Sequence, residues 1–186
     1  MARTRSVESR EAILDAAMAL ARKSGYGNVT MEALALAAGV GKQTIYRWWS
    51  SLGEVVLEAL REHARTIPAP ETGTLEGDLS AFLRATFRLA RGPEGTAPIL
   101  KGLMAEAQLD DRFAPRFAEF IEERRGALRT VVLRHMPRSP RNEVDATVDM
   151  LFGAMWYRML VGHGELDAAF AQTLAKLAAR HRGETR

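Results

Sequence analysis

Apolar residues recur along the chain at intervals of three and four positions, the spacing that places them on one face of an α-helix. The first such stripe lies between the polar residues Ser9 and Ser24 and consists of Ile13, Leu14, Ala17, Leu20 and Ala21. No stretch alternates convincingly between apolar and polar residues at period two, so we expect no β-strands. The pattern predicts an all-α protein of about nine helices.

Capping residues and helix breakers set the limits of these helices. Thr30 and Ser51 are suited to begin helices as N-caps, and Gly39 interrupts the helical pattern between them. The loop that contains Pro68, Pro70 and Gly73 separates a small N-terminal head from a larger body. The predicted helices span residues 10–24, 31–38, 42–48, 52–66, 75–90, 97–109, 115–135, 143–161 and 167–179.

The composition is that of an ordinary globular protein, with 186 residues of which 47% are hydrophobic and 26% are charged. The absence of cysteine excludes disulfides, thiolate nucleophiles and zinc sites that need sulfur. The first ten residues lack the apolar core of a secretory signal. The longest apolar stretch, Met150–Tyr157, is far shorter than the ~20 residues of a membrane span. We therefore expect a cytoplasmic protein with no membrane contact and no cofactor.

Positive charge is concentrated at the N-terminal end. Seven basic and four acidic residues lie between Met1 and Leu52, so this segment accounts for the whole net charge of +3. A basic head on a neutral body indicates a polyanionic partner at one end of the molecule.

Residues 30–52 carry the pattern of a helix-turn-helix. Two short predicted helices are joined at Gly39, where the turn needs a positive φ, and small Ala35 suits the point where they cross. The apolar residues that would seal the corner are Leu34, Val40 and Ile45. The second helix then exposes side chains suited to the major groove of DNA, namely Lys42, Gln43, Thr44, Tyr46 and Arg47.

A glycine-hinged helix pair is common in all-helical proteins, but this one carries a more specific signature. The stretch GKQTIYRWW from Gly41 to Trp49, after TMEALA at Thr30–Ala35 and AGV at Ala38–Val40, resembles the DNA-binding head of TetR-family transcriptional regulators. The resemblance covers residues 9–60, and the segment LFGAMWYR at Leu151–Arg158 resembles the dimerising helix of that family. It implies a helix-turn-helix DNA-binding domain with a basic N-terminal arm at residues 1–52. A helical ligand-binding and dimerisation domain would follow at residues 53–186.

The resemblance also implies roles for individual residues of the head. Thr30 and the Tyr46 hydroxyl would contact phosphate, and Arg3 and Arg5 would form a flexible arm that enters the minor groove or adds charge. The residues implied to approach bases or the nearby backbone are Lys42, Gln43, Thr44 and Arg47.

One position departs from the family pattern. Family members commonly carry a lysine at the start of the fourth helix that contacts the DNA backbone, whereas this sequence has Leu52 after Ser50 and Ser51. We therefore predict a shallower salt dependence of DNA binding than in relatives, by about one unit of slope for each lost contact.

The body offers candidates for a ligand pocket and for a dimer interface. Methionine and aromatic side chains can adapt to an apolar ligand, although core packing explains each of them equally well. The candidate ligand-binding residues are Phe82, Phe87, Met104, Gln108, Phe117, Trp156 and Tyr157. The helix at 143–161 is apolar around most of its circumference, which together with the last helix suggests a two-fold interface. The candidate interface residues are Val148, Leu151, Phe152, Met155, Phe170 and Leu174.

The resemblance implies a dimeric regulator, in the family's manner a repressor, that binds a palindromic double-stranded operator and is released by a largely apolar small molecule. An enzyme is an alternative, but the four histidines are far apart in sequence and no phosphate-loop or dinucleotide pattern is present. A helical interaction protein that does not bind DNA is the other alternative. Specific, salt-sensitive binding to a palindromic duplex would distinguish the regulator from both.

Overall fold

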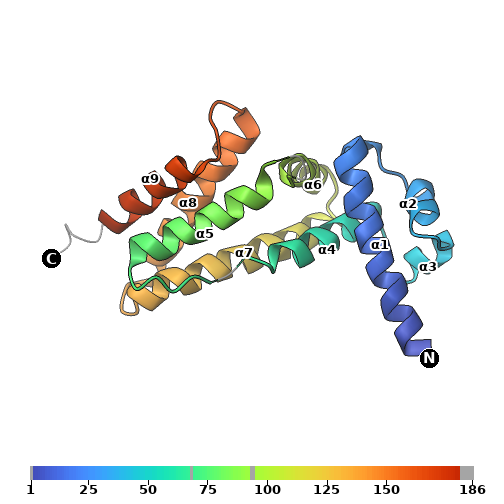
Figure 1. The fold of residues 1–186 in the computed structure, drawn as a ribbon, viewed down its shortest axis with the longest axis horizontal. Coiled ribbons are helices and arrows are strands. Elements are labelled where there is room, and N and C mark those ends of the chain that lie inside the picture. Colours follow the sequence, from blue (N-terminus) through green and yellow to red (C-terminus); the bar gives the residue numbers. More distant parts are fainter. Residues whose placement is uncertain (1, 68, 93–94, 181–186) are drawn as a thin grey trace. The chain divides into compact units, whose positions relative to one another are not determined.

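A computed structural model describes residues 2–67, 69–92 and 95–180, with the side chains of residues 2–6 left out. Within these ranges the chain forms nine α-helices and one short 3-10 helix, η1, and none of the described residues lies in a strand (Figure 1). The elements are α1 (Ala2–Ser24), η1 (Tyr26–Asn28), α2 (Met31–Ala37), α3 (Lys42–Tyr46), α4 (Leu52–Ala64), α5 (Leu75–Ala90), α6 (Ala97–Leu109), α7 (Ala114–His135), α8 (Arg141–Val161) and α9 (Ala168–Arg180). The predicted all-α class is confirmed.

The chain divides into two compact units, the first drawn from Met1–Arg65 and Thr96–Phe120. In this unit α1 packs against α2 and α4, and α6 packs against η1, α1 and α4. Its buried side chains include Ile13, Met18, Leu34, Ile45 and Val56, each no more than 1% exposed. The helix-turn-helix therefore rests on a core that α1, α4 and α6 build together, and the unit contains more than the first four helices.

The second unit comprises Thr66–Gly95 and Ile121–Arg186. Helices α5 and α9 lie side by side along their length (Figure 1), with a hydrogen bond of 2.8 Å from the Ser80 hydroxyl to the Gln172 side-chain carbonyl. The rings of Phe87 and Phe170 stack at 5.8 Å between the same two helices. Arg129 on α7 binds Asp145 on α8, so these two helices are also joined.

The start of the first helix differs from the prediction. The spacing of apolar residues predicts a helix over residues 10–24, whereas α1 begins at Ala2. The chain from Ala2 to Ser24 contains neither glycine nor proline, so nothing interrupts the helix once it has formed. The backbone of Arg3 and Arg5 is therefore helical rather than that of an extended arm, and their side chains lie outside the described residues.

None of the helices in the described ranges combines the length and apolar character that crossing a membrane requires.

Candidate DNA-binding site

The turn between α2 and α3 is built from local hydrogen bonds and one glycine. The Thr30 hydroxyl accepts the backbone N–H of Ala33 at 3.1 Å and so caps α2. Gly39 has φ +65°, a conformation that other residues rarely adopt, and the N–H of Val40 donates to the carbonyl of Ala35 at 3.0 Å. These contacts hold α2 and α3 in the helix-turn-helix arrangement that the sequence predicts.

Burial divides the side chains of the pair into an inner and an outer set. Leu34, Ala35 and Ile45 are buried. The exposed outer set contains Thr30, Lys42, Gln43, Tyr46 and Arg47, with Thr44 half-buried beside them. We call Lys42, Gln43, Thr44, Tyr46 and Arg47 the recognition edge. The structure brings together these five residues, all of them predicted from sequence, on one short helix and its C-cap.

The two cations of the recognition edge each have an intramolecular partner. The ammonium of Lys42 lies 2.7 Å from Oε1 of Glu32, which stands in the first turn of α2. This hydrogen bond lowers the pKa of the Glu32 carboxyl and raises that of Lys42. The guanidinium of Arg47 lies over the ring of Trp48, 4.9 Å from its centre. Sequence reasoning missed Glu32, because the pair forms across the turn between residues ten positions apart.

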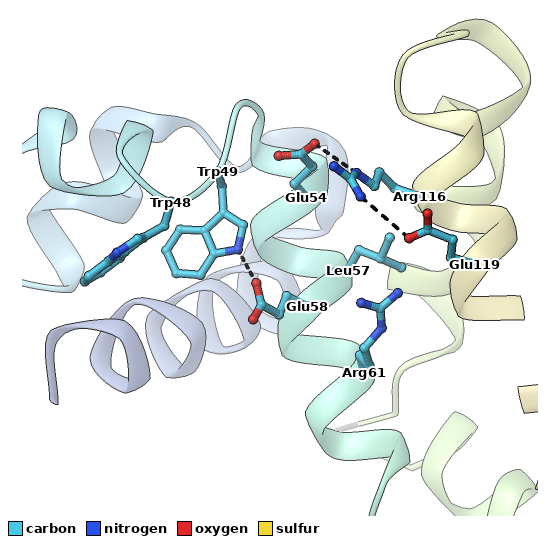
Figure 2. Close-up of a pocket in the computed structure, with 8 residues that line it drawn as sticks. All are labelled: Trp48, Trp49, Glu54, Leu57, Glu58, Arg61, Arg116 and Glu119. Atoms are coloured by element: carbon cyan, nitrogen blue, oxygen red, sulfur yellow. Dashed lines mark hydrogen bonds and ion pairs between the residues drawn. The ribbon is translucent and has the colours of Figure 1, made fainter. Parts of the chain in front are cut away.

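The two tryptophans after α3 have different surroundings. Figure 2 shows the buried ring of Trp49 directed at Glu58 on α4, to which its indole N–H donates, while Trp48 lies on the far side. Arg10 on α1 also pairs with Glu58. The Glu58 carboxylate thus ties the end of the recognition helix to α1 and α4. Because Trp49 is only 4% exposed, its ring packs in the core of this unit.

The first turn of α4 carries the carboxylate of Glu54. Ser51 is the N-cap, and its hydroxyl accepts the N–H of Glu54 at 3.2 Å. The Glu54 carboxylate in turn accepts the N–H of Ser50 at 2.7 Å, and its other oxygen lies 3.8 Å from Arg116 on α7 (Figure 2). The spacing of serine and glutamate is a capping box, a sequence signal that identifies Glu54. Glu54 and Arg116 line a groove of about 170 Å³ together with Trp48, Trp49 and Glu58.

Helix α6 is held to the head by a phenol–carboxylate contact. The Tyr26 hydroxyl in η1 donates to the Glu106 carboxylate, and burial, with the help of that carboxylate, raises the Tyr26 pKa far above its usual range. A Cβ placed on Gly102 would lie 2.5 Å from the Tyr26 ring, so only glycine allows this approach. Sequence reasoning had no signal for a pair that lies 80 positions apart.

The amino-acid sequence matches two family models. Residues 13–59 match "Bacterial regulatory proteins, tetR family", and residues 69–178 match "Tetracyclin repressor-like, C-terminal domain". The second match alone covers more than half of the chain. This chain belongs to the TetR family of transcriptional regulators.

Individual relatives agree with this TetR-family assignment. An uncharacterised HTH-type transcriptional regulator of Bacillus subtilis, YdeS, is 28% identical over 92% of this chain and 88% of its own length. The crystal structure of the TetR family regulator SCO0332 superimposes with a TM-score of 0.76 at 29% identity, covering 92% of this chain and 97% of that one. The multidrug binding protein EbrR, solved in complex with proflavin, shares the fold with a TM-score of 0.61 at 20% identity, over 91% and 99% of the two chains.

The predicted ligand-binding residues of this TetR-family regulator do not gather within one unit. Met104, Gln108 and Phe117 fall in the first unit. Phe82, Phe87, Trp156 and Tyr157 fall in the second. Phe82 and Phe87 are buried, with ring partners in Phe152 and Phe170, whereas Gln108 and Tyr157 are exposed. The pocket stays a prediction.

The predicted dimer-interface residues are mostly buried within a single chain, and their place in an interface stays a prediction. Val148, Leu151, Phe152, Met155 and Leu174 are each at most 9% exposed within a single chain, and the ring of Phe170 is covered by the Arg158 guanidinium. Their apolar character therefore serves the protein's own core. The other face of α8 presents exposed Ala146, Met150, Gly153, Tyr157 and Leu160 instead, and α9 exposes Leu177.

Among the described residues, no cluster of histidine, aspartate and glutamate has the arrangement of a metal site.

Proposed function

We propose that this regulator binds a two-fold-symmetric DNA operator as a homodimer, represses transcription there and is released by a largely apolar small molecule. The observation that carries the proposal is the exposed recognition edge on a glycine-hinged helix pair whose inner face is fully buried. Such a helix fits the major groove, where amide and ammonium groups hydrogen-bond base edges and a threonine methyl contacts thymine.

The residues divide into two roles in this proposal. Lys42, Gln43 and Thr44, at the N-terminal end of α3, read bases, as the first residues of recognition helices do. Thr30, Tyr46 and Arg47 contact phosphates and so fix the orientation of the head on the duplex. Tyr46 is 54% exposed, which leaves its hydroxyl accessible to a phosphate oxygen.

The short recognition helix α3 requires two copies of the protein on the DNA. Helix α3 spans five residues and reads few base pairs, so two copies are needed for affinity and for a palindromic site. The exposed face of α8 suits the contact, because Ala146, Met150, Gly153, Tyr157 and Leu160 follow each other at helical spacing. Gly153 has open space around it, so a second backbone can approach closely.

Ligand response is supported by the family and by one fold neighbour. The matched C-terminal model is named for the tetracycline repressor, and EbrR was solved with proflavin bound. Helix α6 belongs to the unit that holds the recognition edge and contacts η1 through Tyr26 and Glu106, so a movement of α6 acts within that unit. A ligand that favours a displaced α6 then lowers DNA affinity, by typically 1–3 kcal/mol.

The experiment is a selection of bound sequences from a pool of random duplexes, followed by titration of the selected duplex. We expect an enriched palindrome whose preference over unrelated duplex falls at least about tenfold in Gln43→Ala and in Thr44→Ala, since each loses base contacts worth about 1–3 kcal/mol per half-site. Thr130→Ala, an exposed threonine of α7, is the matched control and leaves the preference unchanged. Enrichment of no sequence, or equal preference in all variants, contradicts the proposal.

A further inference from the structure

The helix-turn-helix carries a small net positive charge, because one of its two cations is paired with a carboxylate. Between Thr30 and Trp49 the chain carries two cations, Lys42 and Arg47, and one anion, Glu32. The anion lies 2.7 Å from the Lys42 ammonium, and both side chains are at least half exposed. Glu32 therefore stands beside the recognition edge, on the side from which Lys42 projects. A duplex that meets this edge meets the Glu32 carboxylate as well.

We propose that Glu32 is a specificity-determining residue, which holds Lys42 so that its ammonium reads a guanine edge rather than a backbone phosphate. The inference rests on the proposed DNA-binding function and assigns a chemical target to one residue of it.

The choice of target follows from charge. A phosphate that approaches Lys42 is repelled by the carboxylate that already neutralises it, so contact requires the Lys42–Glu32 pair to separate. Guanine O6 and N7 are uncharged acceptors, and they attract the ammonium without repelling its partner strongly. Lysine has three N–H donors, of which Glu32 uses one. Lys42 can therefore donate to guanine while it stays paired.

The salt dependence of binding shows whether Glu32 neutralises Lys42, and the preference for guanine shows which target Lys42 contacts. A free lysine that contacts phosphate releases a counterion and adds about 0.9 to the salt slope. If Lys42 moves from Glu32 to a phosphate, the DNA releases one cation and the exposed Glu32 carboxylate takes one up. The net release of cations is then close to zero, and so is the contribution to the slope. In the wild-type protein Lys42 therefore adds little to the slope, whereas Arg47, which lies over the uncharged Trp48 ring, adds its full share.

The test uses two duplexes, the one that the wild-type protein selects from a random pool and one of alternating dA and dT, which lacks guanine. We expect Glu32→Gln to bind the alternating duplex about five- to tenfold more tightly at 0.1 M salt, with a slope steeper by about 0.9 per head. Its preference for the selected duplex falls by the same factor. Lys42→Gln loses the preference for one guanine in each half-site but keeps the wild-type slope, while Arg47→Gln lowers the slope by about 0.9.

The double variant decides whether Glu32 acts through Lys42. In Glu32→Gln/Lys42→Gln the gain on the alternating duplex disappears. If the gain persists, Glu32 acts by general charge repulsion and the proposal is wrong. The proposal is also wrong if Lys42→Gln lowers the wild-type salt slope as much as Arg47→Gln does. Glu62→Gln, which removes a carboxylate paired with Arg65 elsewhere in the head, is the matched control and changes binding less than about twofold.

Failure of the proposed function gives a different result. In that case the wild-type protein enriches no sequence from the pool, while the alternating duplex still measures the electrostatic effect of Glu32. Circular dichroism of each variant verifies its fold, which we expect to be unchanged because Glu32 and Lys42 are both exposed.

Discussion

The carboxylate of Asp78 on α5 is fully buried and still charged. It accepts the N–H and the hydroxyl of Thr72 at 2.5 and 2.7 Å, and it lies 2.7 Å from Nε2 of His135 and 3.3 Å from Arg134. Burial alone raises the pKa of a carboxyl, but here the hydrogen bonds from His135, Thr72 and Arg134 outweigh it and lower the pKa to about 2. Asp78 thereby ties the loop before α5 to the end of α7.

Replacing Asp78 measures how much its charged carboxylate contributes to the free energy of unfolding. A pKa lowered from about 4 to about 2 in the folded state corresponds to about 2 kcal/mol of stability, present above pH 4 and lost as the pH falls towards 2. We expect Asp78→Asn to lower the free energy of unfolding by about that much at pH 7, and the difference from wild type to shrink as the pH falls from 4 to 2. Urea unfolding at fixed protein concentration measures it.

Asp149→Asn is the control for this measurement, because Asp149 pairs with Arg125 at the surface, where an ion pair contributes at most about 1 kcal/mol. A deficit in Asp78→Asn that stays the same from pH 7 to pH 2 would show that the charge of Asp78 is not what stabilises the loop.

At the scale of single helices, the contact between α6 and η1 depends on Gly102. An added Cβ would lie 2.5 Å from Cδ1 of the Tyr26 ring, closer than real side chains pack. We expect Gly102→Ala to lower the free energy of unfolding by about 1–3 kcal/mol, because the ring must move and strain its hydrogen bond to Glu106. Gly126→Ala on α7 meets open space and is expected to raise stability by up to about 1 kcal/mol, since alanine favours helix. If the two substitutions change the stability equally in thermal unfolding, the close contact between Gly102 and Tyr26 does not stabilise the protein.

The N-terminus of α4 gives a second prediction at this scale. Leu52 is the first residue of α4, and the carboxylate of Glu54 already accepts the Ser50 N–H. We expect Leu52→Lys to tighten binding to the selected duplex and to steepen the salt slope by about 0.9 per head, because a new cation reaches the backbone. Leu109→Lys adds the same charge at an exposed leucine of α6 and serves as the control. An unchanged slope across a salt titration excludes a phosphate near this turn.

Most helix limits could be predicted because they depend on local chemistry. Thr30 and Ser51 cap α2 and α4 through their own hydroxyls, and Gly39 adopts the positive φ that its position requires. Contacts between distant residues left no such signal, and the Glu32–Lys42 and Tyr26–Glu106 pairs appear only when the helices are packed. The sequence of α8 is likewise apolar around most of its circumference, which does not show which face the protein's own core covers.

At the scale of the whole molecule, the exposed stripe of α8 predicts how the protein assembles. We expect Leu160→Lys to remain folded, since Leu160 is 51% exposed, but to sediment as a monomer because a charge is placed in the proposed dimer contact. Its affinity for the selected duplex should fall about a hundredfold, as the two heads no longer bind as one unit. Analytical ultracentrifugation and DNA titration measure the two effects. Leu109→Lys should stay dimeric; if Leu160→Lys does so too, the interface lies elsewhere.

The position of Arg47 over the Trp48 ring has a practical consequence for measuring recognition. Indole emission responds to a nearby cation, so a duplex that draws the guanidinium away from the ring changes the intrinsic fluorescence of the protein. Trp49 is buried and bonded to Glu58, and therefore supplies a steady background. Trp156→Phe removes the one tryptophan of the sequence outside the head. The protein thus carries its own optical reporter at the recognition edge, with which the binding step can be timed without a label.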